Sequence, residues 1–227
     1  MIDSLSPNFD ERDAPVTILV LHYTGMTDAA SAIERLSDPV AKVSCHYLVA
    51  EDGQIVRMVP EEKRAWHAGK SHWRGIDSLN SHSIGIEIVN PGHEIGYRPF
   101  PDAQIDALIP LVSDILKRHG ITRGNVVGHS DIAPARKQDP GELFPWYRLA
   151  KLRLALPRPT KNLMDPHWSD AGFLLALERF GYDVTNALAA TVAFQRRFRP
   201  ELIDGTIDGE CRAILLALLL PKPTGDD

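Results

Sequence analysis

Two histidines and one aspartate in this sequence have the types and the spacing of a metal site. His22 follows the apolar run 16–21, and His129 follows the shorter apolar run 126–128. Short runs rich in β-branched residues are typical of buried strands, so each histidine is expected where a strand ends. Asp139 comes ten residues after His129, on a stretch whose prolines predict a loop.

If the two strands are neighbours in one sheet, these three side chains meet at its edge. Zinc takes imidazole nitrogen and carboxylate oxygen as ligands, and a catalytic zinc site has three protein ligands and one open position. A single histidine after a strand is more often an ordinary loop residue. The matched pair together with Asp139 is what favours a metal site. The adjacent residues His129, Ser130 and Asp131 do not predict a catalytic triad, because neighbours on an extended chain point apart.

The segment 83–90 predicts a strand that carries a single acid, Glu87. Ile86 and Ile88 belong to one face of this strand and Glu87 to the other. A carboxylate in an otherwise apolar strand is costly unless it is paired or solvated. Glu87 is therefore either a solvent-facing residue of a half-exposed strand or, if its side faces the metal cleft, a general base for the attacking water.

The composition is that of an ordinary globular protein and argues against binding to nucleic acid. The 227 residues carry a formal net charge of −5, with 44% hydrophobic and 24% charged residues, and no basic stripe is present. Cys45 and Cys211 are far apart, which predicts reduced thiols rather than a disulfide framework. The first residues show no signal peptide or lipobox, and no apolar run is long enough for a transmembrane segment. A cytoplasmic protein is expected, or a periplasmic one if an export signal has been trimmed.

The hydrophobic pattern alternates between strands and helices as far as residue 152 and is all-helical afterwards. An Asp-Gly pair at 52–53 predicts a hairpin between strands at 45–50 and 55–59. Helices are expected at 27–36, at 101–119 and at 144–152, with Asp28 or Thr27 capping the first and Asp102 the second. Residues 157–162 contain two prolines and charged residues and show no periodicity. They predict a linker between a domain at 1–156 and a second domain at 163–221. The second domain is expected to form three helices without a Cys, His or carboxylate constellation of its own.

Several of these motifs together resemble the Amidase_2 family of zinc-dependent N-acetylmuramoyl-L-alanine amidases. The resemblance covers roughly residues 5–155 and is carried by the segments 21–24, 43–49, 64–69, 83–87, 127–132 and 137–141. The segments 193–198 and 204–208 resemble the three-helix peptidoglycan-binding-1 module, an order of domains that is similar to the AmiD branch. The resemblance implies an α/β fold with a mixed central sheet flanked by helices, plus a small C-terminal three-helix bundle.

The resemblance also implies roles for individual residues. His22, His129 and Asp139 would bind zinc, and Glu87 and Lys137 would form the catalytic pair. Glu87 would take the proton of the attacking water and pass it to the leaving amine, while Lys137 would stabilise the tetrahedral oxyanion. The bond cut would join the lactyl group of N-acetylmuramic acid, or of its 1,6-anhydro form, to L-alanine. The residues expected to line the substrate cleft are Trp66, His67 and Ala68.

The expected role is peptidoglycan recycling, with action on imported muropeptides as in the shorter AmpD branch. Members of the AmiD branch are usually exported lipoproteins, whereas this chain shows no export signal. On this hypothesis the C-terminal bundle shapes the cleft more than it anchors intact wall. Three alternatives remain: a wall-turnover or lysin-type amidase acting on intact peptidoglycan, a non-catalytic recognition protein, and a zinc peptidase that cuts within the stem peptide. The complete set of three ligands disfavours the non-catalytic protein.

Overall fold

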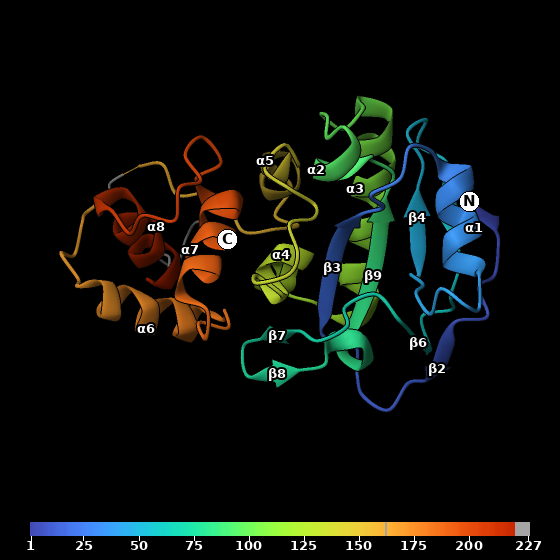
Figure 1. The fold of residues 1–227 in the computed structure, drawn as a ribbon, viewed down its shortest axis with the longest axis horizontal. Helices are drawn as coiled ribbons and strands as arrows, with labels where there is room; N and C mark the ends of the chain where they lie inside the picture. Colours follow the sequence, from blue (N-terminus) through green and yellow to red (C-terminus); the bar gives the residue numbers. More distant parts are fainter. Residues whose placement is uncertain (162, 221–227) are drawn as a thin grey trace.

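The computed structural model describes residues 1–161 and 163–220. Residue 162 of the predicted linker and residue 221 of the predicted second domain lie outside the described residues. The chain forms a six-stranded sheet in the order β1-β5-β4-β9-β3-β10, with helices on both faces and three further helices beside it (Figure 1). The sheet is mixed, because β4 and β5 pair antiparallel and the other pairs are parallel. This confirms the predicted α/β fold.

The strands of the central sheet are short, and two small sheets accompany it. In sheet order the strands are β1 (Ile2–Asp3), β5 (Ile55–Arg57), β4 (Tyr47–Val49), β9 (Ser83–Ile88), β3 (Ile18–Tyr23) and β10 (Val126–Gly128). The small sheets pair β2 (Phe9–Glu11) with β6 (Lys63–Ala65) and β7 (His72–Trp73) with β8 (Ile76–Asp77). The predicted hairpin joins β4 to β5, and Gly53 in its turn has a φ of +87°, a conformation that favours glycine.

Alternation along the two central strands decides which side chains share a face. Leu19 and Leu21 of β3 join the apolar core formed with α3 (Asp102–His119) and α5 (Trp146–Lys151), and the three isoleucines of β9 join the same core. Ile18 and Val20 point to the opposite face and belong to a second core. His22 continues that second series, because side chains two residues apart lie on one face of a strand.

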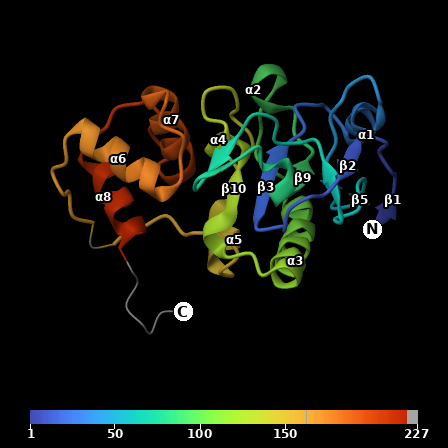
Figure 2. The ribbon, with the colours of Figure 1, turned by 90° about the horizontal axis from the view of Figure 1, so that it is seen from below.

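The first face of the sheet is covered by α3 and the second by α1 (Ala29–Ser37) and the short helix α4 (His129–Ile132), as the two views show (Figures 1 and 2). The side chain of Asp28 caps α1, as predicted. The predicted cap of α3 was wrong: Asp102 is its first residue, Pro101 occupies the cap position, and the Asp102 carboxylate accepts a hydrogen bond from Arg148 instead. The remaining short helices are α2 (Gly92–Ile95), η1 (Leu79–His82) and η2 (Arg123–Asn125).

The three predicted C-terminal helices are present as α6 (Asp170–Phe180), α7 (Ala187–Phe198) and α8 (Gly209–Leu219). They lie beside α4 at the β10 edge of the sheet (Figures 1 and 2). Phe173 and Phe194 of these helices share one apolar cluster with Val20 and Val127 of the sheet. The C-terminal helices therefore complete the second core of the molecule and do not stand apart from the sheet. No helix in the described part of the chain is long and apolar enough to cross a membrane.

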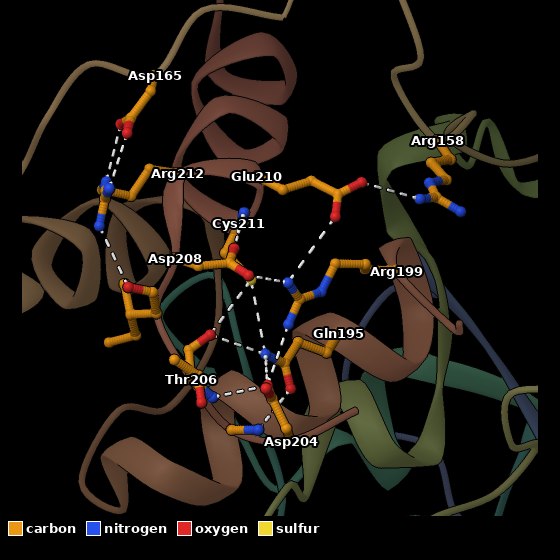
Figure 3. Close-up of polar contacts among 12 residues, drawn as sticks. Arg158, Asp165, Gln195, Arg199, Asp204, Thr206, Asp208, Glu210, Cys211 and Arg212 are labelled. Carbon is orange, nitrogen blue, oxygen red and sulfur yellow. Dashed lines mark hydrogen bonds and ion pairs between the residues drawn. The ribbon is translucent and has the colours of Figure 1, made fainter. Parts of the chain in front are cut away.

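The C-terminal helices also contain a buried polar network of their own around Arg199 (Figure 3). The Arg199 side chain is 1% exposed and pairs with the carboxylates of Asp204, at 3.1 Å, and Asp208. Gln195 donates to Asp204 at 3.0 Å, and Asp208 caps α8 by accepting from the Cys211 backbone N–H. This network places carboxylates together as partners of Arg199 and not as a set of metal ligands. Its carboxylates gather around an arginine, which supplies the balancing charge.

Candidate metal centre

Three buried ligand atoms converge where β3 and β10 end. These strands are parallel neighbours with Val127 opposite Val20, so their ends lie side by side. The Nδ1 atoms of His22 and His129 each lie 3.1 Å from Asp139 Oδ2 and 2.9 Å from each other. This confirms the predicted meeting of the three side chains. The predicted loop after His129 instead begins with one helical turn, α4.

The hydrogen bonds behind His22 fix which of its nitrogens carries the proton. The Ser83 hydroxyl donates to the Leu79 carbonyl at 2.6 Å, so Ser83 Oγ accepts from His67 Nε2 at 3.2 Å. His67 Nδ1 is then an acceptor, and His22 Nε2–H donates to it at 3.0 Å. Because a neutral imidazole has a single N–H, His22 Nδ1 presents a lone pair toward Asp139.

His129 is held in the same tautomer by a different partner. Its Nε2 lies 3.1 Å from the Ala68 carbonyl and 3.4 Å from Arg136 Nη2; the nearer partner can only accept, so we assign the proton to Nε2 and the lone pair to Nδ1. Two lone pairs and one carboxylate oxygen therefore converge with no proton between them. Such a set of acceptors requires a cation, and two imidazoles with one carboxylate fit zinc. Partners on the far nitrogens of both histidines are typical of metal-binding histidines.

Burial of the cluster affects its ionisation. Burial, with a smaller contribution from the neighbouring His129, lowers the pKa of His22 to about 4, so the ring is neutral at pH 7. The neutral imidazole is the form that binds a metal ion.

Gly85 of β9 is required by the close approach of His67. A Cβ built on Gly85 would lie 2.4 Å from His67 Cγ, a distance that no side chain tolerates. The glycine that interrupts this strand in the sequence therefore makes room for the imidazole that supports His22. Trp66 and His67 both line the cleft, whereas Ala68 is buried and contributes its carbonyl to His129. Their contact with substrate stays a prediction.

A cavity of about 350 Å³ lies beside the cluster, and His129 and Asp139 line it. Glu87 lines it and is the register partner of His22 in the sheet, so the strand turns its acid toward the cleft and not to bulk solvent. Glu87 Oε2 is buried and has no hydrogen-bond partner among the described residues. Burial raises the pKa of this carboxyl well above its usual range; Asp139 adds to the effect and Lys137 opposes it. A carboxyl with a raised pKa in a cavity is a candidate for general acid–base chemistry.

Lys137 lines the same cavity, two residues before Asp139 on the loop. Its effect on Glu87 shows that the two catalytic candidates lie within electrostatic reach of each other. Four residues of the sequence-derived set therefore line one cavity: Glu87, His129, Lys137 and Asp139. The fifth, His22, contacts His129 and Asp139 directly. The roles of these residues in catalysis remain predictions.

A second polar group in the cavity wall was missed by sequence reasoning. The Tyr23 hydroxyl lies 2.9 Å from His93 Nδ1, and His93 Nε2 lies 3.1 Å from a Glu142 oxygen. Glu142 accepts from Nε2–H, so Tyr23 donates to Nδ1. The signal in the sequence is the position of His93, which directly follows the turn-forming Pro91 and Gly92 where β9 ends.

Comparison with known proteins points to one family. The family described as Amidase_2, N-acetylmuramoyl-L-alanine amidase, matches residues 12–142. The chain is 41% identical over 230 residues to N-acetylmuramoyl-L-alanine amidase AmiD of Escherichia coli K12, with 90% of this chain and 82% of that protein covered. It is 42% identical over 164 residues to 1,6-anhydro-N-acetylmuramyl-L-alanine amidase AmpD of Enterobacter cloacae, with 63% of this chain and 84% of that protein covered.

Solved structures agree with the sequence matches. The complex of E. coli AmiD with anhydro-N-acetylmuramic acid-L-Ala-D-γ-Glu-L-Lys has a TM-score of 0.83 at 39% identity and covers 92% of this chain and 91% of its own. AmpDh3 of Pseudomonas aeruginosa has a TM-score of 0.82 at 36% identity, with 94% and 93% covered. Both alignments extend over nearly the whole chain, so the similarity includes the C-terminal helices.

Proposed function

The chain belongs to the Amidase_2 family and is an N-acetylmuramoyl-L-alanine amidase, and we propose that it works with zinc held by His22, His129 and Asp139. The bond cleaved is the amide between N-acetylmuramic acid, or its 1,6-anhydro form, and L-alanine in muropeptides. One observation carries the zinc assignment: three buried acceptor atoms meet with no proton to share. When bound, zinc supplies Lewis-acid chemistry, which polarises a carbonyl and lowers the pKa of water.

Glu87 is proposed to move the proton during hydrolysis. Its unpaired carboxyl faces the cavity, and its raised pKa suits a group that takes a proton from water and later returns it. Water adds its oxygen to the amide carbon and gives a proton to Glu87. The C–N bond then breaks, and Glu87 delivers that proton to the departing nitrogen of L-alanine.

Lys137 is proposed to stabilise the negative charge that develops on the amide oxygen. Its ammonium group lines the cavity on the loop that also carries Asp139. A fixed positive charge in a partly dehydrated cleft stabilises a developing oxyanion more than the neutral ground-state carbonyl. Trp66 and His67 are proposed to contact the substrate from the cleft wall, together with the adjoining backbone of Ala68.

The proposed substrates are soluble muropeptides in peptidoglycan recycling, with the enzyme acting in the cytoplasm. The similarity to proteins named for the 1,6-anhydro substrate supports this choice, as does the solved AmiD complex with an anhydromuropeptide. The C-terminal helices are proposed to be a peptidoglycan-binding-1-type domain at 163–221, joined through residues 157–162 to the catalytic domain 1–156. Action on intact peptidoglycan is the competing proposal, because such a domain would also serve that substrate.

Mass-spectrometric product analysis tests the proposal. The purified protein is offered soluble anhydromuropeptide and intact sacculi side by side, with and without a zinc chelator. Release of intact stem peptide from the soluble substrate, lost with chelator and restored by zinc, is expected. Preferential release from sacculi would contradict the recycling role, and fragments cut within the stem peptide would contradict the amidase. Recovery of the native protein mainly in a periplasmic fraction would contradict the cytoplasmic assignment.

A further inference from the structure

Asp131 is a buried carboxylate that connects the metal centre to the C-terminal helices. It is 1% exposed and lies in α4, two residues after the candidate ligand His129. Its Oδ2 accepts from the Gly128 backbone N–H at 2.7 Å, and its Oδ1 accepts from the Tyr182 hydroxyl at 2.6 Å. Tyr182 comes from the segment between α6 and α7. One carboxylate thus holds two regions of the chain together.

The first of these hydrogen bonds fixes the backbone that carries His129. Gly128 ends β10, and His129 begins α4 directly after it. The same turn is tied to the third ligand, because Ser130 N–H donates to the Asp139 carbonyl at 2.8 Å. A Cβ at Gly128 would lie 2.7 Å from Pro140 Cδ, so the Gly128 backbone packs directly against the residue after Asp139. Movement at Gly128 would therefore displace two of the three ligands.

The second hydrogen bond keeps the Asp131 carboxylate in place. A buried carboxylate is costly unless donors surround it. Arg197 contributes charge from α7, but its Nε lies 3.9 Å from Asp131 Oδ2, too far for a hydrogen bond. Tyr182 is fully buried, and its ring packs edge-on against Trp73 at 5.2 Å, so its hydroxyl has a fixed position.

We propose that Tyr182 is a positioning residue of the metal centre, acting through Asp131 on the Gly128–His129 turn. The C-terminal helices are then part of the machinery that binds the metal ion, in addition to any contact with peptidoglycan. This inference rests on the proposed zinc site, because its consequence is a change in zinc affinity.

The test is the zinc affinity of Tyr182→Phe, measured by competition with a chromogenic chelator. This change keeps the ring in the core and removes only the hydroxyl. Loss of a direct partner of a ligand weakens metal affinity by about 10–100-fold, and Tyr182 is further removed, so we expect zinc Kd to rise by about 3–10-fold. Tyr47→Phe is the matched control. Tyr47 donates to Glu61 at 2.7 Å on the opposite face of the sheet, so its zinc Kd should stay within about twofold of the wild type.

Two changes at Asp131 separate positioning from a general loss of stability. In an Asp131→Ala background, Tyr182→Phe should cause less than about a twofold further change in zinc Kd. Asp131→Asn should retain most of the affinity, because a hydroxyl can accept from the amide as well as donate to a carboxylate. The proposal is overturned if Tyr182→Phe leaves zinc Kd unchanged, if Tyr47→Phe raises it equally, or if the effect persists without Asp131. Absence of zinc binding by the wild-type protein would overturn the proposed function itself.

Discussion

Two polar clusters in this protein differ in how their charges are balanced. Around Arg199, the carboxylates of Asp204 and Asp208 meet a guanidinium from the same chain (Figure 3). At the sheet edge, Asp139 and two imidazoles meet with only acceptor atoms facing one another. The first cluster is complete within the protein, and the second requires a cation from solution.

The difference separates a stabilising network from a functional site without reference to any relative. Buried charges without partners are expensive, so a protein retains them where a ligand completes them. The Arg199 network serves the local fold, since it caps α8 and holds the preceding turn. The cluster at the sheet edge serves binding. Substitutions in both clusters can break or sharpen this distinction.

The largest effect is expected for Asp139→Asn, which keeps the shape of the side chain and removes its charge. Losing a metal ligand removes several kcal/mol of transition-state stabilisation, so kcat/KM should fall by at least about 10³-fold and zinc binding should be lost. Asp204→Asn makes the same chemical change in the Arg199 network and should leave both quantities within about twofold. Equal effects of the two changes on zinc binding would break the comparison. Amidase kinetics and zinc titration give the two readouts.

Glu87→Gln is expected to separate chemistry from metal binding. The amide cannot take a proton from water, so kcat should fall by about 10²–10⁴-fold while zinc Kd stays within about threefold. Steady-state kinetics with soluble muropeptide and zinc competition provide the measurements. A variant that keeps its kcat would show that another group moves the proton.

Asp208→Ala tests the cluster around Arg199, whose charges are balanced within the protein. It removes the cap of α8 and one partner of a buried arginine, but Asp208 is itself 38% exposed, which screens part of the ion pair. We expect the free energy of unfolding to fall by about 1–3 kcal/mol, as seen in urea denaturation, with zinc Kd unchanged. Weakened zinc binding in the folded variant would show that the two clusters are not independent.

His46 is a buried histidine with two backbone partners and one charged side-chain neighbour, Arg12. The Gly85 N–H donates to its Nδ1 at 3.0 Å, and its Nε2 lies 3.2 Å from the Lys63 carbonyl and 2.9 Å from Arg12 Nη2. Burial, with a smaller contribution from the charge of Arg12, lowers its pKa to about 3. The unfolded chain takes up a proton near pH 6.5 and the folded protein does not, so this contribution to stability is complete above pH 6.5 and is lost as the pH falls toward 3.

His46→Asn should therefore flatten the acid side of the stability curve. Its amide oxygen can still accept from Gly85, but the side chain no longer titrates. The slope of the free energy of unfolding between pH 6 and 4 should decrease by up to about 1.4 kcal/mol per pH unit, measured by urea denaturation of zinc-free protein. Unchanged slopes would mean that His46 is already protonated in the folded protein.

Local patterns in the sequence predicted the elements and the three ligands but not the contacts that support them. His22 and His129 could be found because parallel neighbouring strands end at the same edge of a sheet. Period-two alternation put Glu87 opposite its isoleucine neighbours, but only the packing of α3 decides which face is covered. The bond from Tyr182 to Asp131 joins residues 51 apart in the chain, and no local pattern encodes it. The predicted Asp102 cap was wrong because of another long-range contact: Arg148, which is 46 residues away in the chain, donates to that carboxylate.

The most direct test of the central claim is the zinc stoichiometry of the wild-type protein beside Asp139→Asn, by native mass spectrometry after equilibration with zinc. The three acceptor atoms of His22, His129 and Asp139 converge with no proton between them. We therefore expect one zinc ion per wild-type chain and none in the variant. A wild-type chain that stays metal-free, or a variant that keeps its zinc, would contradict the assignment of His22, His129 and Asp139 as the metal centre.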